Sequence, residues 1–360
     1  MALHFHHKKH TLHFKFEAGT SRGSLTSRDS YFIFLTDRQN DIQGIGEASP
    51  LKMLSVDDRD DLEELITEFG PLFSEIPDGT RPEDIYKLVA DIIPADLPSL
   101  RFAFETALLD LIHGGKRIIF KNDFSISGAS IPINGLIWMG SEPFMHDQVT
   151  EKLATGYDCI KMKIGAIDFD KELAILSAIR SSYSSGQVTL RVDANGAFKA
   201  VEARKKLAEL AALQIHSIEQ PLAAGQWEAM AELCALKILP VALDEELIGV
   251  NGCQDKLKLL KAIRPQYIIL KPTLLGGFHS TKEWIEVAES LKIGWWITSA
   301  LESNIGLNAI SQFTGQFKVS LAQGLGTGQL YHNNVASPLV VKQGKIFYSP
   351  EKNWDLSLIR

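Results

Sequence analysis

Residues 159–165 read CIKMKIG, an apolar run that carries two lysines one residue apart. Side chains alternate between the two faces of a β-strand, so Lys161 and Lys163 share one face and the apolar residues share the other. Two neighbouring ammonium groups repel each other, and an apolar strand offers little to screen them. The stretch therefore predicts a strand whose lysine-bearing face meets negative charge from elsewhere in the fold.

Similar short apolar runs occur on both sides of this stretch and alternate with helical segments such as residues 170–183. Together with 159–165, the expected strands are 131–138, 189–196, 217–222, 240–247, 267–274, 295–301 and 319–328. Eight β/α units are the number found in a TIM-type (β/α) barrel. A doubly wound open sheet is the alternative, but eight regular units favour a closed barrel. The fold class is α/β.

The first part of the chain has a different pattern. Strand-like runs at 11–19, 31–37 and 42–51 precede a helical region at about 57–115, which indicates an α+β unit. A turn-rich stretch at 18–30 separates the first two strands, and we expect residues Ser21 to Arg28 to form a mobile lid. We expect an α+β domain at 1–125, the barrel at 126–335, and a C-terminal segment at 336–360 that returns to the first domain.

Composition limits the classes of function. A net charge of −7 and the lack of a long basic run argue against nucleic-acid binding. The apolar runs are too short to span a membrane, and the chain start shows no secretion-signal pattern. Three scattered cysteines fit a reducing compartment, so we expect a cytoplasmic protein. The oligomeric state stays open.

Charged or polar residues recur near the ends of successive expected strands at a nearly constant spacing. They are Lys161 and Lys163, Asp193, Glu219, Asp244, Lys271 and Ser299. In a barrel such positions lie at the C-terminal rim, where catalytic groups gather. One such residue alone is best explained as a solvated strand end, but a series in phase on consecutive strands is not.

Three consecutive strands supply Asp193, Glu219 and Asp244. Carboxylates that converge in a barrel mouth repel one another unless a hard cation neutralises them, and oxygen ligands suit Mg²⁺. No histidine or cysteine falls in phase with them, which argues against zinc. The lysine pair on one side and Lys271 on the other would complete a balanced cluster. We expect neighbouring positive charge to lower each lysine's pKa, and a partly neutral lysine can act as a base.

At this point the sequence shows a family resemblance that covers nearly the whole chain. The motifs KMK, RVDAN, IEQPL, ALDEEL and ILKPTLLGG, in this order, resemble the muconate-lactonizing branch of the enolase superfamily. The early motif GIGEASPL resembles the capping-domain strand of the same group. Within that branch, PINGLIWMG, LKPTLLGGF and TSALESNIGLNAISQF are most similar to the o-succinylbenzoate synthase family.

The resemblance implies roles for individual residues. It implies that Asp193, Glu219 and Asp244 bind Mg²⁺, with Mn²⁺ as an acceptable substitute. It implies that Lys163 is the general base, Lys161 its pKa-lowering companion, and Lys271 the lysine that stabilises an enediolate from the opposite side. The substrate contacts that we expect from position are Arg191, Asn195, Ser299 and Gly324. Glu302 and Ser303 follow in the same loop as Ser299, and Glu245 is expected to lie behind the metal ligands.

The implied activity is Mg²⁺-dependent syn-dehydration of a small anionic carboxylate through an enediolate, which forms o-succinylbenzoate for menaquinone biosynthesis. Racemisation of N-succinylamino acids and epimerisation of dipeptides are the alternatives, because the same lysines serve both faces of an α-carbon. The expected eighth strand, AQGLGTGQ, has no acid to hold a substrate amine, which disfavours dipeptides. A lactonizing enzyme and a non-catalytic anion-binding barrel are further alternatives.

Overall fold

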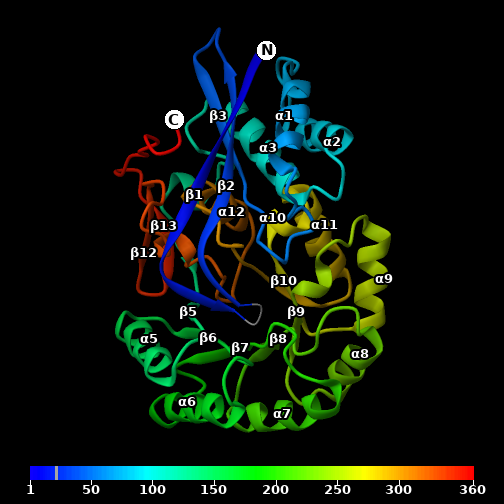
Figure 1. Cartoon of the computed structure of the whole chain (residues 1–360), viewed down its shortest axis with the longest axis vertical. Coiled ribbons are helices and arrows are strands. Elements are labelled where there is room, and N and C mark those ends of the chain that lie inside the picture. The colour runs from blue at the N-terminus through cyan, green and yellow to red at the C-terminus, as the bar shows by residue number, and fades with distance from the viewer. Residues whose placement is uncertain (21–22) are drawn as a thin grey trace.

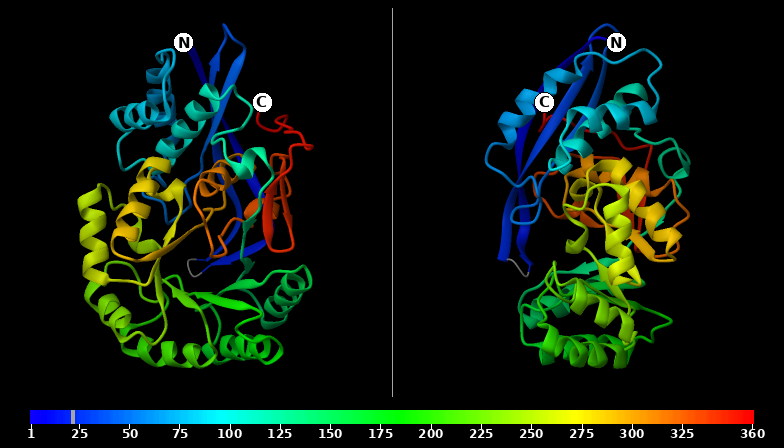
Figure 2. Two further views of the ribbon diagram at one scale, coloured as in Figure 1. Left: turned by 180° about the vertical axis from the view of Figure 1, so that it is seen from behind. Right: turned by 90° about the vertical axis from the view of Figure 1, so that its right-hand side faces the viewer.

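The computed structural model describes residues 1–20 and 23–360 of the chain. It has an upper part built from the first residues and a lower barrel, and both chain termini lie at the upper end (Figures 1 and 2). We propose the same division as above, with a capping domain (1–125), a barrel (126–335) and a C-terminal segment (336–360). Among the described residues, no helix is long and apolar enough to cross a membrane.

The capping domain is an antiparallel sheet covered by helices. The sheet has the order β1 (Leu3–Thr20), β2 (Gly23–Asp37), β3 (Ile42–Ala48). The helical elements are α1 (Leu62–Phe69), the 3₁₀ turn η1 (Gly70–Phe73), α2 (Pro82–Ile92) and α3 (Pro98–Ile112). Strand β3 approaches α3 very closely, because a Cβ at Gly44 or Gly46 would lie 1.9 Å from a backbone oxygen of α3. The two glycines of QGIGEA thus allow this helix to pack directly on the strand.

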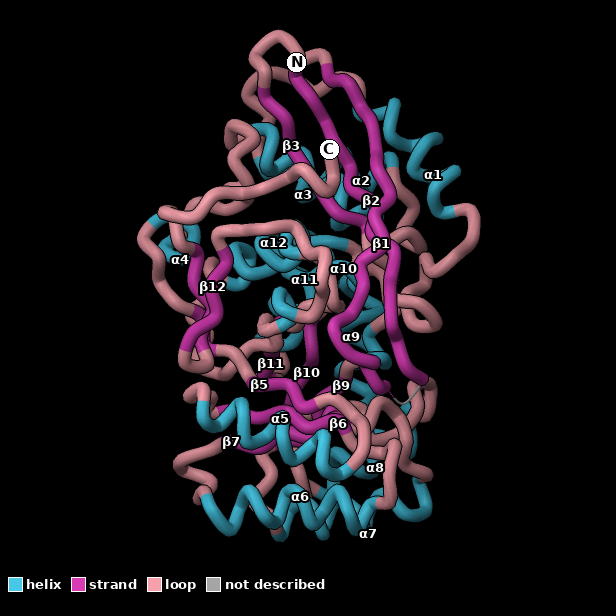
Figure 3. The backbone as a smooth tube through the Cα atoms, turned by 60° about the vertical axis from the view of Figure 1, so that its left-hand side comes forward, coloured by secondary structure: helices cyan, strands magenta, loops and turns pink. Residues whose placement is uncertain are grey.

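The long hairpin of β1 and β2 corrects one expectation from the sequence, that a turn-rich connection runs through residues 18–30. Residues 23–28 are part of β2, which pairs with β1 with a register shift between His13 and Ala18. The lid at Ser21 to Arg28 stays a prediction. The lid residues Ser21 and Arg22 lie outside the described residues. The hairpin runs from the capping domain down to the barrel mouth (Figure 3), where Gly19 forms a β-bridge with Met139. Turn-type residues are tolerated here because exposed strand positions accept polar side chains.

The barrel contains a seven-stranded parallel sheet in the order β11-β10-β9-β8-β7-β6-β5. Its strands are β5 (Gly135–Ile137), β6 (Cys159–Lys163), β7 (Thr189–Asp193), β8 (Ser217–Glu219), β9 (Val241–Leu243), β10 (Tyr267–Leu270) and β11 (Gly294–Ile297). The larger helices around it are α5 (Glu142–Ala154), α6 (Phe169–Ser182), α7 (Ala200–Ala212), α8 (Trp227–Leu236), α9 (Cys253–Ile263), α11 (Gly277–Ser290) and α12 (Asn304–Thr314). Short elements are α4 (Asp123–Ile126), α10 (Pro272–Leu275), η2 (Glu245–Leu247) and η3 (Thr327–Gln329).

The expected eighth strand, residues 319–328, is not a regular strand. It closes the ring through two parallel bridges, Ile133 with Gln323 and Thr298 with Gly324. The Gly324 N–H donates to the Ile297 carbonyl at 2.8 Å, and the Gln323 side chain accepts from the Ile297 N–H at 2.8 Å. The barrel is therefore closed as expected, but a glutamine side chain replaces part of the missing ladder.

The expected first barrel strand, 131–138, is divided in two. Its first half is β4 (Ile131–Pro132), which pairs with β13 (Lys345–Tyr348), and its second half is β5 in the barrel. Strand β13 forms an antiparallel pair with β12 (Leu339–Lys342). After these strands the chain packs on the capping-domain sheet, where Ile359 is buried against Phe32 and Phe34. The C-terminal segment thus contacts both other parts of the molecule.

Candidate active site

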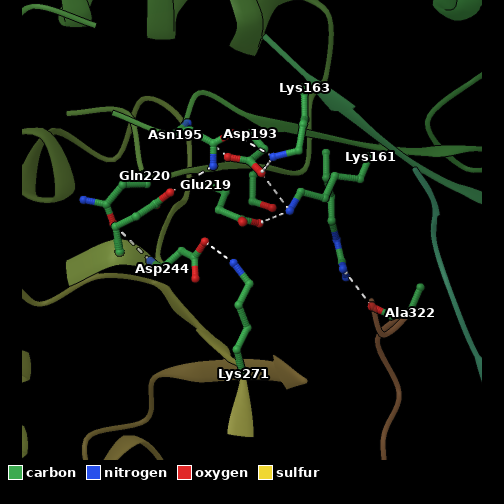
Figure 4. Close-up of polar contacts among 12 residues, drawn as sticks. Lys161, Lys163, Asp193, Asn195, Glu219, Gln220, Asp244, Lys271 and Ala322 are labelled. Carbon is green, nitrogen blue, oxygen red and sulfur yellow. Dashed lines mark hydrogen bonds and ion pairs between the residues drawn. The ribbon is translucent and has the colours of Figure 1, made fainter. Parts of the chain in front are cut away.

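The charged residues expected at the rim come together at one end of the barrel (Figure 4). Strands β6, β7 and β8 place Lys163, Asp193 and Glu219 side by side in register. Asp244 directly follows β9, and Lys271 directly follows β10. The parallel strands therefore gather residues that are far apart in sequence, as the constant spacing predicted.

The two lysines of CIKMKIG share one partner. Lys161 Nζ lies 2.9 Å from Asp193 Oδ2 and 2.6 Å from Glu219 Oε2, and Lys163 Nζ lies 3.1 Å from the same Asp193 oxygen. Lys163 also donates a 2.7 Å hydrogen bond to Asn195 Oδ1. The negative charge that the strand required comes from the next two strands of the barrel.

Lys271 stands across the cluster and donates to Asp244 Oδ2. Burial acts to lower the pKa of Lys271, but the charges of Asp244 and Glu219 outweigh it and raise the pKa above its usual range. The lysines and carboxylates thus form one interlocked group with Lys161 and Lys163 on one side and Lys271 on the other (Figure 4).

The expectation that a neighbouring charge lowers the pKa of Lys161 is wrong for these contacts. Burial does act in that direction, but Asp193 and Glu219 raise the pKa of Lys161 above its usual value because they are in direct contact with it. Conversely, Lys161 and Lys163 overcome burial and hold the pKa of Asp193 below its usual range. Burial, together with the nearby Asp193 charge, raises the pKa of Glu219 to about 8.

The carboxylates fit a hard cation by their chemistry. All three donors are buried oxygen ligands at neighbouring strand ends, which is the donor type that Mg²⁺ prefers. Glu219 Oε1 accepts no hydrogen bond from any described residue, although the side chain is buried. Among the described residues, no three His, Cys, Asp or Glu side chains lie close enough together to hold a metal ion as they stand. Lys161 contacts Asp193 and Glu219, and Lys271 contacts Asp244. The chemistry of the donor set suits Mg²⁺.

Asn195 connects this cluster to the residues behind it. It has a left-handed backbone with φ of 43°, its N–H donates to Asp193 Oδ1 at 3.0 Å, and its amide donates to Glu245 Oε1 at 3.0 Å. The Asn195 backbone therefore orients Asp193, its side chain orients Lys163, and Glu245 lies one contact further away, as expected.

A cavity of about 430 Å³ opens at this end of the barrel. Both parts of the molecule line it. The charged cluster contributes Lys161, Lys163, Asp193, Asn195 and Lys271, and apolar walls come from Phe16, Leu25, Leu51, Met53, Leu136, Trp138, Phe144, Leu301 and Leu330. Leu25 lies in the stretch that was expected to form a lid. The cavity contacts of Phe16, Leu51 and Met53 were not predicted, because a local pattern shows burial but not which cavity a side chain faces.

Ser299 and Gly324 line the cavity, but their hydrogen-bond donors are already used. The Ser299 hydroxyl donates to Glu302 Oε2 at 2.5 Å, and it accepts from the Leu301 N–H and from Thr327 Oγ1. The Gly324 N–H is used in the ring closure described above. Both residues line the cavity, and their role as substrate contacts stays a prediction. Neither the Gly324 N–H nor the Ser299 hydroxyl hydrogen is free to bind a substrate carboxylate.

Arg191 does not line the cavity, which corrects its expected role as a substrate contact. Its Nη1 donates to the Ala322 carbonyl at 2.7 Å, and its guanidinium lies 4.0 Å from the centroid of the Trp296 ring. It lies on the same strand face as Asp193 and level with Lys161, which does line the cavity. Its side chain is instead directed to the irregular eighth segment, where it binds the Ala322 carbonyl.

Comparison with known proteins agrees with this architecture. Residues 145–351 match the family described as Enolase C-terminal domain-like. The chain belongs to the enolase superfamily.

Relatives within the superfamily have different activities. An o-succinylbenzoate synthase from Desulfotalea psychrophila is 48% identical, over 94% of this chain and 97% of the relative. A hydrophobic dipeptide epimerase from Enterococcus faecalis is 27% identical, over 82% of each chain. The predicted membership of the enolase superfamily is confirmed.

Solved structures confirm the predicted combination of a barrel with an N-terminal domain. MenC from Desulfotalea psychrophila superposes with a TM-score of 0.85 at 42% identity, covering 96% of this chain and 100% of that one. The dipeptide epimerase from Enterococcus faecalis, in complex with Mg and the dipeptide L-Leu-L-Tyr, superposes with a TM-score of 0.84 at 22% identity, covering 98% of each chain. The second likeness concerns the fold alone.

Proposed function

We propose that the chain catalyses the syn-dehydration of 2-succinyl-6-hydroxy-2,4-cyclohexadiene-1-carboxylate to o-succinylbenzoate, a step of menaquinone biosynthesis in the cytoplasm. The observation that carries the proposal is the 48% identity to an o-succinylbenzoate synthase across 97% of that relative's length. The lysine pair and the opposing Lys271, both facing one cavity, support it.

The proposed metal ligands are Asp193, Glu219 and Asp244, with Mg²⁺ as the cation and Mn²⁺ as a substitute. When bound, the cation would polarise the substrate carboxylate and favour negative charge on it. The uncoordinated Glu219 oxygen and the Mg in a homologous epimerase structure support this assignment.

Lys163 is the proposed base. In its neutral form its amine takes the proton from the carbon next to the substrate carboxylate, and the electron pair of the broken C–H bond moves into the carboxylate to give an enediolate. The C–O bond to the β-hydroxyl then breaks, the ring becomes aromatic, and the Lys163 ammonium returns its proton to the leaving oxygen to form water. One acid/base on one face is enough for a syn elimination.

Lys271 is the proposed electrostatic partner on the other face. Its position across the carboxylates from Lys163 lets its ammonium stabilise the enediolate without moving a proton (Figure 4). The apolar walls around Phe16, Trp138 and Leu301 exclude water and strengthen these charge interactions.

Racemisation of N-succinylamino acids is the second candidate, because Lys163 and Lys271 face each other across one site. Dipeptide epimerisation has less support, since the segment 319–328 contains no acid to hold a substrate amine. Purified protein with Mg²⁺ should convert the cyclohexadiene acid to o-succinylbenzoate, and the loss of the diene absorbance measures the rate. This rate should exceed the rate at which the protein racemises any N-succinylamino acid. Efficient racemisation without dehydration would overturn the proposal.

A further inference from the structure

The wall 299–303 is a loop with a strained backbone, and its residues Ser299, Ala300 and Leu301 line the cavity. Leu301 lines the cavity with a φ of 67°, in the left-handed region that side chains with a Cβ rarely adopt. Its N–H donates to Ser299 Oγ at 3.0 Å, and its carbonyl accepts from the Tyr331 hydroxyl at 2.5 Å. Such strain persists where surrounding contacts over-determine the conformation, so the contacts of this loop are informative.

Arg28 of β2 holds the loop from the capping domain. Its Nη1 donates to the Ala300 carbonyl, and its Nη2 donates to the Ser49 carbonyl and, at 2.6 Å, to Ser49 Oγ. The side chain is 7% exposed, so the guanidinium is solvated by these oxygens and not by water. One buried cation therefore joins β2, the end of β3 and the cavity wall.

Glu47 of β3 holds the other end of the same loop. Its carboxylate accepts from the Ser303 N–H at 2.8 Å, from Ser303 Oγ at 2.5 Å and from the Gly306 N–H at 2.9 Å. Ser303 is the N-cap of α12, so a buried carboxylate from the other domain lies at the positive end of this helix. A Cβ at Gly306 would lie 2.7 Å from the Glu302 Cβ and 3.1 Å from Glu47 Oε2, so glycine leaves room for both side chains.

The loop also contacts the segment that carries Lys271. Glu302 is fully buried and accepts from Thr273 Oγ1, two residues after Lys271, and from Ser299 Oγ. A displacement of the loop would therefore change the wall first and the Lys271 segment second.

We propose that Arg28 and Glu47 are positioning residues that clamp the wall 299–303 in its strained form and thereby set the fit of the substrate. This rests on the proposed function, because the wall and the lysines line the same cavity. Neither residue touches the charged cluster on β6 to β10, so loosening the clamp weakens substrate binding more than the chemical step. A merely stabilising contact between domains would instead lower the melting temperature and leave both kinetic constants of the folded enzyme unchanged.

The test compares Arg28→Met with Arg180→Met. Arg180 of α6 also donates to backbone carbonyls, those of Leu213, Tyr183, Val188 and Gln214, but it lies outside the cavity lining. For Arg28→Met we expect KM for the cyclohexadiene acid to rise about tenfold with kcat changed by less than about threefold. Arg28→Lys keeps the positive charge but lacks the several N–H donors of the planar guanidinium, so it should give an intermediate KM. Arg180→Met should leave both constants at their wild-type values.

Hydrogen exchange provides a readout that needs no substrate. The Leu301 and Ser303 amides should exchange at least about tenfold faster in Arg28→Met and not in Arg180→Met, because local opening controls exchange. If Arg28→Met does not fold, Glu47→Gln takes its place with the same expectations. Unchanged exchange and unchanged KM would overturn the clamp. Absence of dehydration by the wild type together with faster exchange in the variant would overturn the proposed function and leave the clamp standing.

Discussion

The charged rim on β6 to β10 and the wall 299–303 border one cavity, but they are built differently. The rim residues sit at or near the ends of successive strands, with Lys161 and Lys163 together on β6, so their places follow from the local register of short apolar runs. The wall depends on Arg28 and Glu47, which lie more than two hundred residues earlier in the chain. Residues that carry chemistry are thus fixed by repeated local structure, whereas the shape of the cavity is fixed by contacts between distant segments.

Replacement of the proposed base should have the largest effect. Lys163→Ala removes the amine that takes the α-proton, and we expect kcat for dehydration to fall by about a thousandfold or more. The measurement is steady-state turnover with saturating Mg²⁺, beside circular dichroism to show that the fold is retained. A folded variant with more than about a tenth of the wild-type rate would mean that Lys163 is not the base.

Loss of a rim carboxylate should have the next largest effect. Glu219→Gln should weaken Mg²⁺ binding by at least about tenfold in a calorimetric titration, because a neutral amide replaces a charged ligand. Glu246→Gln is the matched control, since Glu246 is buried beside the site but accepts from the Gly225 N–H and the Gln220 amide. Equal Mg²⁺ affinity in both variants would remove Glu219 from the ligand set.

Lys271→Arg distinguishes proton transfer on one face of the α-carbon from proton transfer on the other. Guanidinium keeps the positive charge but stays protonated, so it cannot accept a proton. With an N-succinylamino acid as a probe in D₂O, the variant should exchange the α-proton of one enantiomer through Lys163 and lose exchange of the other. Racemisation at the wild-type rate would show that Lys271 moves no proton even in the wild type.

The smallest expected effect is on the pH dependence of stability, through a carboxylate that lies between the domains. Glu105 of α3 accepts from the Phe278 N–H at the start of α11, and burial raises its pKa from 4.5 to about 8. Because the folded state holds this proton more tightly than the unfolded state, the stabilisation is complete below about pH 4.5 and is lost as the pH rises through about 8. Glu105→Gln should flatten the fall of the unfolding free energy across this range, measured by urea denaturation. An identical pH profile for both proteins would contradict the assignment.

The same contrast explains which parts of the fold were predictable. Seven of the eight expected barrel strands contribute to the parallel sheet, because each contains a short apolar run. The segment 319–328 resembles a strand in sequence, but its backbone makes isolated bridges and relies on the Gln323 side chain. No local sequence pattern predicts that a side chain takes the place of backbone pairing there.

The predictions for the hairpin and for the substrate contacts were inaccurate for related reasons. Residues 23–28 have the composition of a turn, yet long-range pairing with β1 makes them a strand. Ser299 lines the cavity as expected, but its hydroxyl is bound by Glu302, a contact that position on a strand cannot show. Arg191 was assigned from its strand face alone, but the direction of its side chain depends on Trp296 and Ala322 from the far side of the ring.

The most direct test of the account is the identity of the product formed by the wild-type protein. Incubation with 2-succinyl-6-hydroxy-2,4-cyclohexadiene-1-carboxylate and Mg²⁺, followed by NMR, should show o-succinylbenzoate and water formed in a reaction that a chelator stops and added Mg²⁺ restores. Unchanged substrate under these conditions, with fast racemisation of an N-succinylamino acid by the same sample, would contradict it.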